Sequence, residues 1–292
     1  MSVSESIAIH RGLANGFFGA PTSYLAEIHV GAMSIVDFDG DGLLDVLATI
    51  SGPIGSDDAN AGVALLRGIG GGAFQLEIGA RGMGAGNVPG LAPADVDADG
   101  DLDVVFAILL AYGETDLGLL PGGPTGDVRF GREISTATEW IRGGIGSGDF
   151  DDDGRDLIVG DRAAIWVLHG APLDQFVVAH TIPLAPDQYA DEVIVEDLDG
   201  DAIEDAVVLA RRISWSLGAI EVFTGRPDGT IRRAPSFPSH AGVASFDLGE
   251  IDGDGRKDLL VSTTTIPALR YHRHLAGAQF GAPIVIPVHW VP

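Results

Sequence analysis

The stretch that decides the fold reads Asp37-Phe38-Asp39-Gly40-Asp41-Gly42-Leu43-Leu44-Asp45. Variants of this acidic loop recur at intervals of roughly 50 residues, and such a spacing indicates a repeat architecture. The loops together hold more than half of the 42 acidic residues in this 292-residue chain. In chain order, loops one to five occupy residues 37–45, 95–103, 149–156, 197–205 and 250–258.

The loop pattern D-x-D-x-D-G-x-x-D has carboxylates at positions 1, 3, 5 and 9, and a tightly coiled chain can bring them to one centre. Glycine at position 6 permits a positive φ at the sharp turn, and the residue at position 7 can offer its backbone carbonyl. Carboxylates packed together repel one another unless a cation lies between them. Calcium accepts irregular oxygen geometry more readily than magnesium does, so the pattern predicts up to five Ca²⁺ sites.

The predicted calcium ligands are the residues at positions 1, 3, 5, 7 and 9 of each loop, with one position fewer in the third loop. They are Asp37, Asp39, Asp41, Leu43 and Asp45; Asp95, Asp97, Asp99, Asp101 and Asp103; Asp149, Asp151, Asp153, Arg155 and Asp156; Asp197, Asp199, Asp201, Ile203 and Asp205; and Glu250, Asp252, Asp254, Arg256 and Asp258.

Three loops depart from the pattern. Loop three is one residue short, so Asp156 stands at position 8. Loop four has Ala202 where glycine is expected, which predicts a strained turn. Loop five begins with Glu250, a longer carboxylate. Loops one and two match fully, and we expect metal binding to be best supported there.

An EF-hand is the main alternative for such a loop, and the sequence disfavours it. An EF-hand needs a glutamate at position 12 and a helix after it. Position 12 is apolar in loops one, two, four and five, and the loops continue into β-branched runs such as residues 46–50 and 104–108. These runs are typical of buried strands. Solvated Asp-Gly turns without metal are a second alternative, disfavoured by the regular recurrence of five loops.

The segments between the loops repeat a pattern of short apolar strands separated by glycine-containing turns, as in residues 62–68, 75–79 and 192–196. Four short strands for each stretch of roughly 50 residues are typical of a β-propeller blade. No amphipathic stretch with helical periodicity appears. The sequence therefore predicts an all-β protein, a β-propeller of four-stranded blades.

Two further strands, at residues 7–10 and 24–30, precede the first acidic loop. We therefore predict five full blades plus an incomplete N-terminal blade, about six blade positions, in a single domain over residues 1–292. The incomplete blade is expected to pack against the last one, at residues 268–291, or to be completed by upstream sequence or by a second chain.

The sequence resembles the FG-GAP/VCBS repeat family, the integrin-α-like β-propellers. The motif that names the family stands at Phe18-Gly19-Ala20-Pro21 and again at Phe280-Gly281-Ala282-Pro283, and the acidic loops match its calcium loop. The resemblance covers essentially the whole chain. It implies calcium at one rim of a toroid and an extracellular or cell-surface module for adhesion, which binds a protein or a glycan without catalysis.

Charge excludes some classes of partner. The formal net charge is −25 at pH 7, which disfavours nucleic acid and anionic membrane surfaces. No apolar run approaches the ~20 residues of a membrane span, so no membrane insertion is expected. The first residues lack the basic and apolar regions of a signal peptide. Cysteine is absent, which excludes disulfides and thiolate metal sites.

Two function classes remain: a non-catalytic recognition or scaffold module, and a propeller-type polysaccharide lyase or hydrolase with a site at the central mouth. The sequence shows no catalytic pair outside the acidic loops, so we expect no enzyme and predict no catalytic residues. His272 and His274 share a strand face without a third ligand nearby, and are expected to be surface or crevice histidines rather than metal ligands. The tryptophans are expected in the core or between blades rather than stacked on sugars. The oligomeric state stays open.

Overall fold

The computed structural model is an all-β protein with 22 strands and no helix among the residues it describes. Those residues are 7–14, 17–25, 28–51, 62–81, 90–109, 115–123, 132–134, 141, 144–151, 156–171, 175–212, 218–235, 237, 242–264 and 267–287. The chain divides into two compact units, Met1–Trp140 and Ile141–Pro292, and each is considered by itself.

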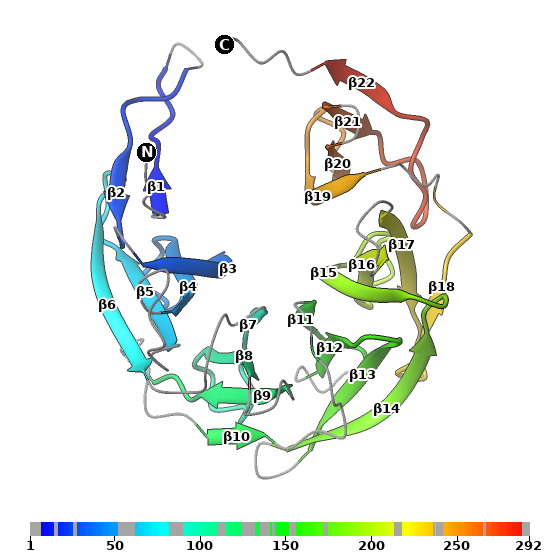
Figure 1. The fold of residues 1–292 in the computed structure, drawn as a ribbon, viewed down its shortest axis with the longest axis horizontal. Helices are drawn as coiled ribbons and strands as arrows, with labels where there is room; N and C mark the ends of the chain where they lie inside the picture. Colours follow the sequence, from blue (N-terminus) through cyan, green and yellow to red (C-terminus); the bar gives the residue numbers. More distant parts are fainter. Residues whose placement is uncertain are drawn as a thin grey trace. The chain divides into compact units, whose positions relative to one another are not determined.

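The first unit contains one two-stranded sheet and two four-stranded antiparallel sheets (Figure 1). The small sheet pairs β1 (Ile7–Ile9) with β2 (Thr22–Tyr24). Blade one consists of β3 (His29–Val36), β4 (Asp45–Ser51), β5 (Gly62–Gly68) and β6 (Phe74–Arg81). Blade two consists of β7 (Leu91–Ala94), β8 (Asp103–Leu109), β9 (Thr115–Leu120) and β10 (Arg132–Ile134).

The second unit contains three four-stranded antiparallel sheets. Blade three consists of β11 (Ile145–Gly148), β12 (Asp156–Gly160), β13 (Ala164–Ala171) and β14 (Gln175–Pro183). Blade four consists of β15 (Gln188–Glu196), β16 (Asp205–Arg212), β17 (Gly218–Gly225) and β18 (Ile231–Arg233). Blade five consists of β19 (Val243–Gly249), β20 (Asp258–Thr263), β21 (Ala268–His272) and β22 (Ile284–Pro287).

Each blade is an up-and-down sheet whose strands follow one another in chain order, and the acidic loop always joins its first strand to its second. The predicted fold class is therefore confirmed: five four-stranded blades of the β-propeller type, with an extra two-stranded sheet at the N-terminus. The small sheet packs on blade one, where Ile7 shares a core cluster with Val46 and Leu66. Whether residues 1–292 form a single domain, and whether the small sheet also packs against the last blade, stay predictions.

The second strand of a blade is buried because it lies inside its sheet and is covered by neighbouring sheets. The first six residues of β4 and of β16 are buried without exception. In the first unit, Leu47 of blade one belongs to the same core cluster as Phe106 of blade two. In the second unit, Ile158 of blade three shares a cluster with Val208 of blade four. This packing fixes the ends of the strands that carry the acidic loops.

One strand prediction was wrong. Residues 24–30 were expected to form a single strand, but β2 ends at Tyr24 and β3 begins at His29. Leu25 adopts a positive φ of 54°, a conformation that interrupts an extended strand. His29 and Val30 therefore pair with β4 and belong to blade one.

The two FG-GAP motifs lie in matching hairpins, one in each unit. Residues 10–21 and 272–283 agree at eight of twelve positions, and the same hydrogen bonds recur. His10 Nδ1 lies 3.0 Å from the carbonyl oxygen of Gly19, and His272 Nδ1 lies 2.9 Å from that of Gly281. The small N-terminal sheet thus corresponds to the third and fourth strands of a blade.

Candidate metal centres

The aspartate that ends each acidic loop is buried and binds two backbone amides. In loop one, Asp45 Oδ2 accepts a hydrogen bond from the amide of Phe38 at 2.9 Å, and Oδ1 accepts one from Gly68 at 2.6 Å. The first amide begins the loop and the second ends the third strand of the blade, so one carboxylate clamps both. The equivalent aspartates of loops two to five make the same two contacts; they are Asp103, Asp156, Asp205 and Asp258.

In blades one, two and four, the residue at the end of the third strand whose amide binds the buried aspartate is glycine, because the backbone of the acidic loop passes too close for a side chain; in blade five this residue is His274. A Cβ on Gly68 would lie 2.5 Å from the carbonyl oxygen of Leu44, and one on Gly225 would lie 2.2 Å from that of Glu204. The buried aspartate holds the loop and the end of the third strand so close together that only glycine fits at these positions.

The other loop carboxylates are held by amides of the loop itself. In loop one, Asp37 accepts from the Gly42 amide at 2.9 Å, Asp39 from the Asp41 amide at 3.2 Å, and Asp41 from the Leu43 amide at 2.8 Å. Loops two and four repeat all three contacts, and loop five repeats the last two. The sequence pattern thus produces one loop geometry in at least four blades.

The coil of the loop requires positive φ at positions 4 and 6. Loop one has glycine at both, with φ of 70° at Gly40 and 86° at Gly42. Loop four has Ala202 at position 6 with φ of 68°, which confirms the predicted strain. The sequence analysis missed Ala98, at position 4 of loop two, where φ is 58°.

The loop carboxylates fit a hard divalent cation. In loops one, two and five, the residues at positions 1, 3 and 5 each offer an oxygen, and these oxygens lie within 4.8 Å of one another. Loop four brings together Asp197, Asp199 and Asp205 in the same way. In loop one, Asp37 Oδ1 is buried and has no hydrogen-bond partner within the described part of the chain, as expected of a ligand atom. All-oxygen donor sets suit calcium.

A basic side chain reaches loops one and five from the third strand of the blade. We call the residue that carries this side chain the strand-end residue. In each blade it immediately precedes the residue whose backbone amide binds the buried aspartate. Arg67 pairs with Asp39 in loop one. Arg273 pairs with Asp252 and Asp254 in loop five. The strand-end residue in loop two is Pro121 and in loop four Thr224. Sequence reasoning missed these pairs, because the partners lie about 20 or more residues apart.

The loop carboxylates differ in pKa, because burial and neighbouring charged groups affect them to different extents. Burial raises the pKa of Asp103 and that of Asp205 to about 6. Burial and the neighbouring Asp201 raise the pKa of Asp199. In loop five, a hydrogen bond from Arg256 lowers the pKa of Asp254.

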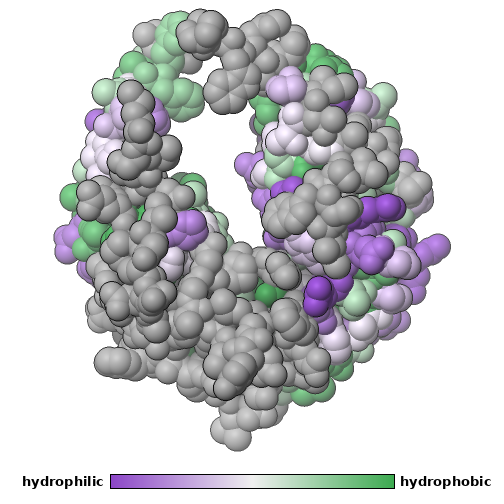
Figure 2. Space-filling view, in the orientation of Figure 1, coloured by the Kyte–Doolittle hydropathy of each residue, from purple (hydrophilic) through white to green (hydrophobic). Residues whose placement is uncertain are grey.

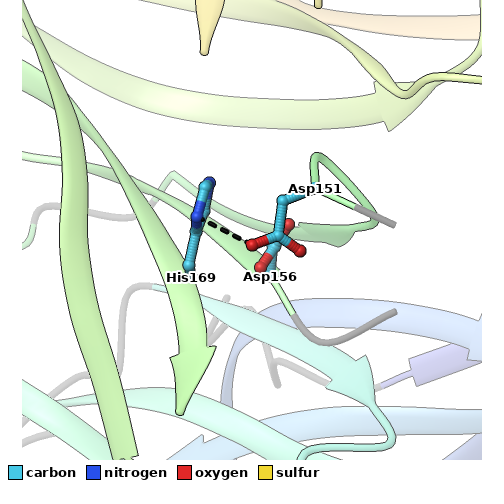
Figure 3. Close-up of side chains that lie close together, drawn as sticks. All are labelled: Asp151, Asp156 and His169. Carbon is cyan, nitrogen blue, oxygen red and sulfur yellow. Dashed lines mark ion pairs between the residues drawn. The ribbon is translucent and has the colours of Figure 1, made fainter. Parts of the chain in front are cut away.

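Loop three differs from the others in the side chains it gathers (Figure 3). Asp151, Asp156 and His169 each offer a ligand atom, and these atoms lie within 4.8 Å of one another. Asp156, at position 8, makes the amide contacts that position 9 makes elsewhere. Two predicted ligands, Asp153 and Arg155, lie outside the described residues.

His272 and His274 were expected at the surface or in a crevice, but both are buried, because they pack between the end of β21 and the hairpin that follows it. His274 Nε2 lies 2.7 Å from the carbonyl oxygen of Gly277, and both imidazoles pack near Phe280 or Phe237. Trp166 lies half-buried on β13, while the other tryptophans fall outside the described residues.

Comparison with known proteins gives the family of the repeats. An FG-GAP-like repeat model matches residues 37–106 and 197–261, which include loops one, two, four and five. The chain carries FG-GAP-like repeats. Each match begins at the acidic loop of one blade and ends in the second strand of the next, so each spans parts of two neighbouring blades.

Comparisons with whole proteins add little to the FG-GAP assignment. No curated protein matches the sequence. Among solved structures, the chain is similar to the V. cholerae biofilm matrix protein Bap1, with 14% identity and a TM-score of 0.42. The match covers 85% of this chain and 38% of that one, and the likeness is too weak to carry function.

Blades four and five of the FG-GAP propeller also border a cavity of about 430 Å³. Arg233 is anchored there: its Nη2 donates to the carbonyl oxygen of Pro183 at 3.1 Å, and its guanidinium lies 5.5 Å from the ring centre of Phe223. Arg232 is exposed. The lining residues are Thr224, Arg232, Arg233, Ala234, Pro235, Ala278 and Gln279.

Surface hydropathy varies over the second unit. Figure 2 shows hydrophilic side chains gathered over β15–β18 and hydrophobic ones along β22, where Ile284, Val285 and Ile286 are exposed. Within the described part of the chain, no helix has the length and apolar character needed to cross a membrane.

Proposed function

We propose that this chain is a calcium-stabilised β-propeller that serves as a non-catalytic recognition or scaffold module, adhesion-like and extracellular, for a protein or glycan partner. The observation that carries the proposal is the shared geometry of loops one, two, four and five. Each gathers three carboxylate oxygens within 4.8 Å, and each lies between the first two strands of a blade. Calcium bound there would neutralise carboxylates that otherwise repel one another.

The ligands of each calcium come from its own loop. In loop one they are Asp37, Asp39 and Asp41, and the corresponding residues serve in loops two and five. In loop four they are Asp197, Asp199 and Asp205. The sequence predicts that the remaining ligand residues of each loop complete the set of oxygen atoms around its calcium. Since the buried aspartates hold strand ends, calcium would act on the stability of the whole blade.

Partner binding is supported by the cavity bordered by Arg232 and Gln279. In a chain of formal net charge −25, an exposed arginine beside an anchored one is a favourable place for an anionic group. Carboxylated or sulfated glycans and acidic peptide segments carry such groups. Exposed Leu43, Leu44 and Ile69 beside loop one offer a separate apolar contact surface.

A glycan array and a pull-down with the calcium-loaded chain test this function, run beside a polysaccharide-degradation assay. We expect calcium-dependent binding of an acidic glycan or protein, weakened at least tenfold by Arg232→Ala. Arg226→Ala, in the same β17–β18 hairpin but outside the cavity, is the matched control and should bind as the unsubstituted chain does. Turnover of a polysaccharide would contradict the non-catalytic role and favour the lyase or hydrolase alternative.

A further inference from the structure

We infer that Asp151, Asp156 and His169 form a site for a divalent first-row transition metal, such as Zn²⁺ or Mn²⁺, chemically distinct from the calcium loops. His169 lies on β13, Asp151 follows β11, and Asp156 begins β12 (Figure 3). An imidazole among the ligands favours such metals over calcium, which prefers oxygen alone. Loop three is the only predicted calcium loop for which the described residues bring a histidine nitrogen into the cluster.

The orientation of His169 is fixed from outside the cluster. Its Nε2 lies 3.0 Å from the carbonyl oxygen of Gly229, in the turn between β17 and β18 of blade four. A carbonyl oxygen only accepts hydrogen bonds, so Nε2 carries the proton. In the neutral imidazole, Nδ1 then presents its lone pair to the carboxylates. Metal-binding histidines are commonly held in this way, with the other ring nitrogen donating to a carbonyl.

The lone pair on Nδ1 needs a cation. Nδ1 lies 2.9 Å from Asp151 Oδ2, and a carboxylate oxygen is also an acceptor, so the two repel unless a proton or a metal lies between them. Ligand atoms that share one zinc ion lie about 3.0–3.4 Å apart, close to this separation.

Charge favours the metal over the proton. A protonated His169 balances one carboxylate, whereas the cluster has two, and Asp156 is only 1% exposed. No lysine or arginine of the described chain pairs with either aspartate. A divalent ion balances both.

Asp156 and Gly229 shape the site. The Asp156 oxygens accept from the amides of Phe150 at 2.6 Å and Gly170 at 3.2 Å, which fixes the carboxylate and leaves each oxygen a second lone pair. A Cβ on Gly229 would lie 2.6 Å from His169 Cε1 and 3.2 Å from Asp151 Cβ. Glycine at this position lets the turn of blade four close directly over the cluster.

Calorimetric titration of ZnCl₂ into the full chain, held in excess CaCl₂ to occupy the all-oxygen loops, tests the site. We expect one zinc site, weakened at least tenfold by His169→Gln and unchanged by the matched control His180→Gln on β14 of the same blade. His169→Arg keeps a cation beside Asp151 but offers no ligand, so it should fold with a near-normal melting temperature and bind no zinc there. Equal zinc binding by the unsubstituted chain and both His169 variants would overturn the proposal.

Manganese gives a second measurement that needs no variant to fold. Spin-echo modulation of Mn²⁺ bound to the calcium-loaded chain should show a directly coordinated ¹⁴N nucleus. Calcium loops alone would show only oxygen ligands. Absence of the nitrogen signal, or absence of any zinc site in the unsubstituted chain, would show that the cluster is an ion pair and not a metal site.

Discussion

Loops four and five lie in adjacent blades of one unit and coil alike, yet their charges are balanced differently. Loop four has five carboxylates and no basic residue, and its strand-end residue is Thr224. Loop five has four carboxylates with Arg256 and Lys257 inside the loop, and Arg273 reaches it from the end of β21. Arginines therefore offset part of the negative charge of loop five, whereas loop four contains no basic residue, and we predict that it needs a cation from solution more strongly.

The pKa values of individual carboxyls also differ between the two loops. Burial raises the pKa of Asp199 and Asp205 in loop four, and no described basic residue pairs with either. Arginine hydrogen bonds lower the pKa of Asp254 in loop five. We therefore predict that loops with the same backbone geometry differ in how strongly they need calcium, and that the strand-end residue contributes to the difference.

Removal of calcium should have the largest effect. A site with Kd ~0.1 mM in ~2 mM Ca²⁺ stabilises the fold by about 1.8 kcal/mol, so four all-oxygen loops contribute roughly 7 kcal/mol, comparable to the stability of a typical domain. Excess EGTA should lower the melting temperature by many degrees in a calorimetric scan. An unchanged melting curve would exclude calcium from both kinds of loop.

Acidification in EGTA should raise stability. The pKa of Asp205 is about 6 in the folded chain and about 3.9 unfolded. The folded state therefore gains a proton first as pH falls, which relieves the cost of a buried charge. Between pH 7.5 and about 5.3 we expect a gain of about 1 kcal/mol from Asp205 and a similar one from Asp103, measured by urea denaturation.

Two variants locate this pH effect. Asp205→Asn should reduce the gain by about 1 kcal/mol, the share expected from Asp205. Asp254→Asn should leave it intact, because a carboxyl with a lowered pKa titrates below this range. A gain that keeps its full size in the Asp205→Asn variant would show that loop four is not its source.

Single ligand substitutions should separate the two loops. Asp199→Asn should remove about 1.8 kcal/mol of calcium-dependent stability, the difference between urea unfolding in calcium and in EGTA. Asp252→Asn should remove less than about 1 kcal/mol, because Arg273 already offsets part of the repulsion in loop five. Equal losses, or a larger loss in loop five, would contradict the role given to the strand-end arginine.

The smallest effects on stability are expected at position 6, where opposite substitutions can be made in loops four and five. Ala202 has a φ of 68° in loop four, so Ala202→Gly should stabilise the chain by about 0.5–1 kcal/mol. Gly255 has a φ of 84° in loop five, and a Cβ there would meet no atom within 4 Å, so Gly255→Ala should destabilise the chain by about 1 kcal/mol through φ alone. Melting temperatures in EGTA measure both. Changes of the same sign would show that the turn tolerates the strain differently in the two loops.

Much of the fold was predictable because its signals are local and repeated. The loops predicted the blades, and residues 62–68 were delimited correctly as β5. The prediction of one strand over residues 24–30 was wrong because Leu25 adopts a positive φ. No residue that favours this conformation, such as glycine, marks the position in the sequence. Leucine adopts this conformation only where surrounding structure requires it.

The candidate sites were predictable only within each loop. The pattern located the carboxylates that cluster, but it treated Asp45 only as a ligand, whereas its carboxylate also binds the amide of Gly68, 23 residues away. His169 meets Asp151 because β13 runs back beside β12, and Gly229 joins them from another blade. Such partners depend on strand register and blade packing, which a local pattern does not contain.

The aspartate clamps also bear on how the chain folds. Asp45 joins residues 7 positions before and 23 after it, and Asp205 joins residues 7 before and 20 after, so each clamp closes within its own blade. Short loops close quickly and at small entropic cost. Once the third strand of a blade has left the ribosome, both residues whose amides bind the buried aspartate of that blade are available. Synthesis can therefore complete the blades in chain order, each buried aspartate closing its own sheet before the next one emerges.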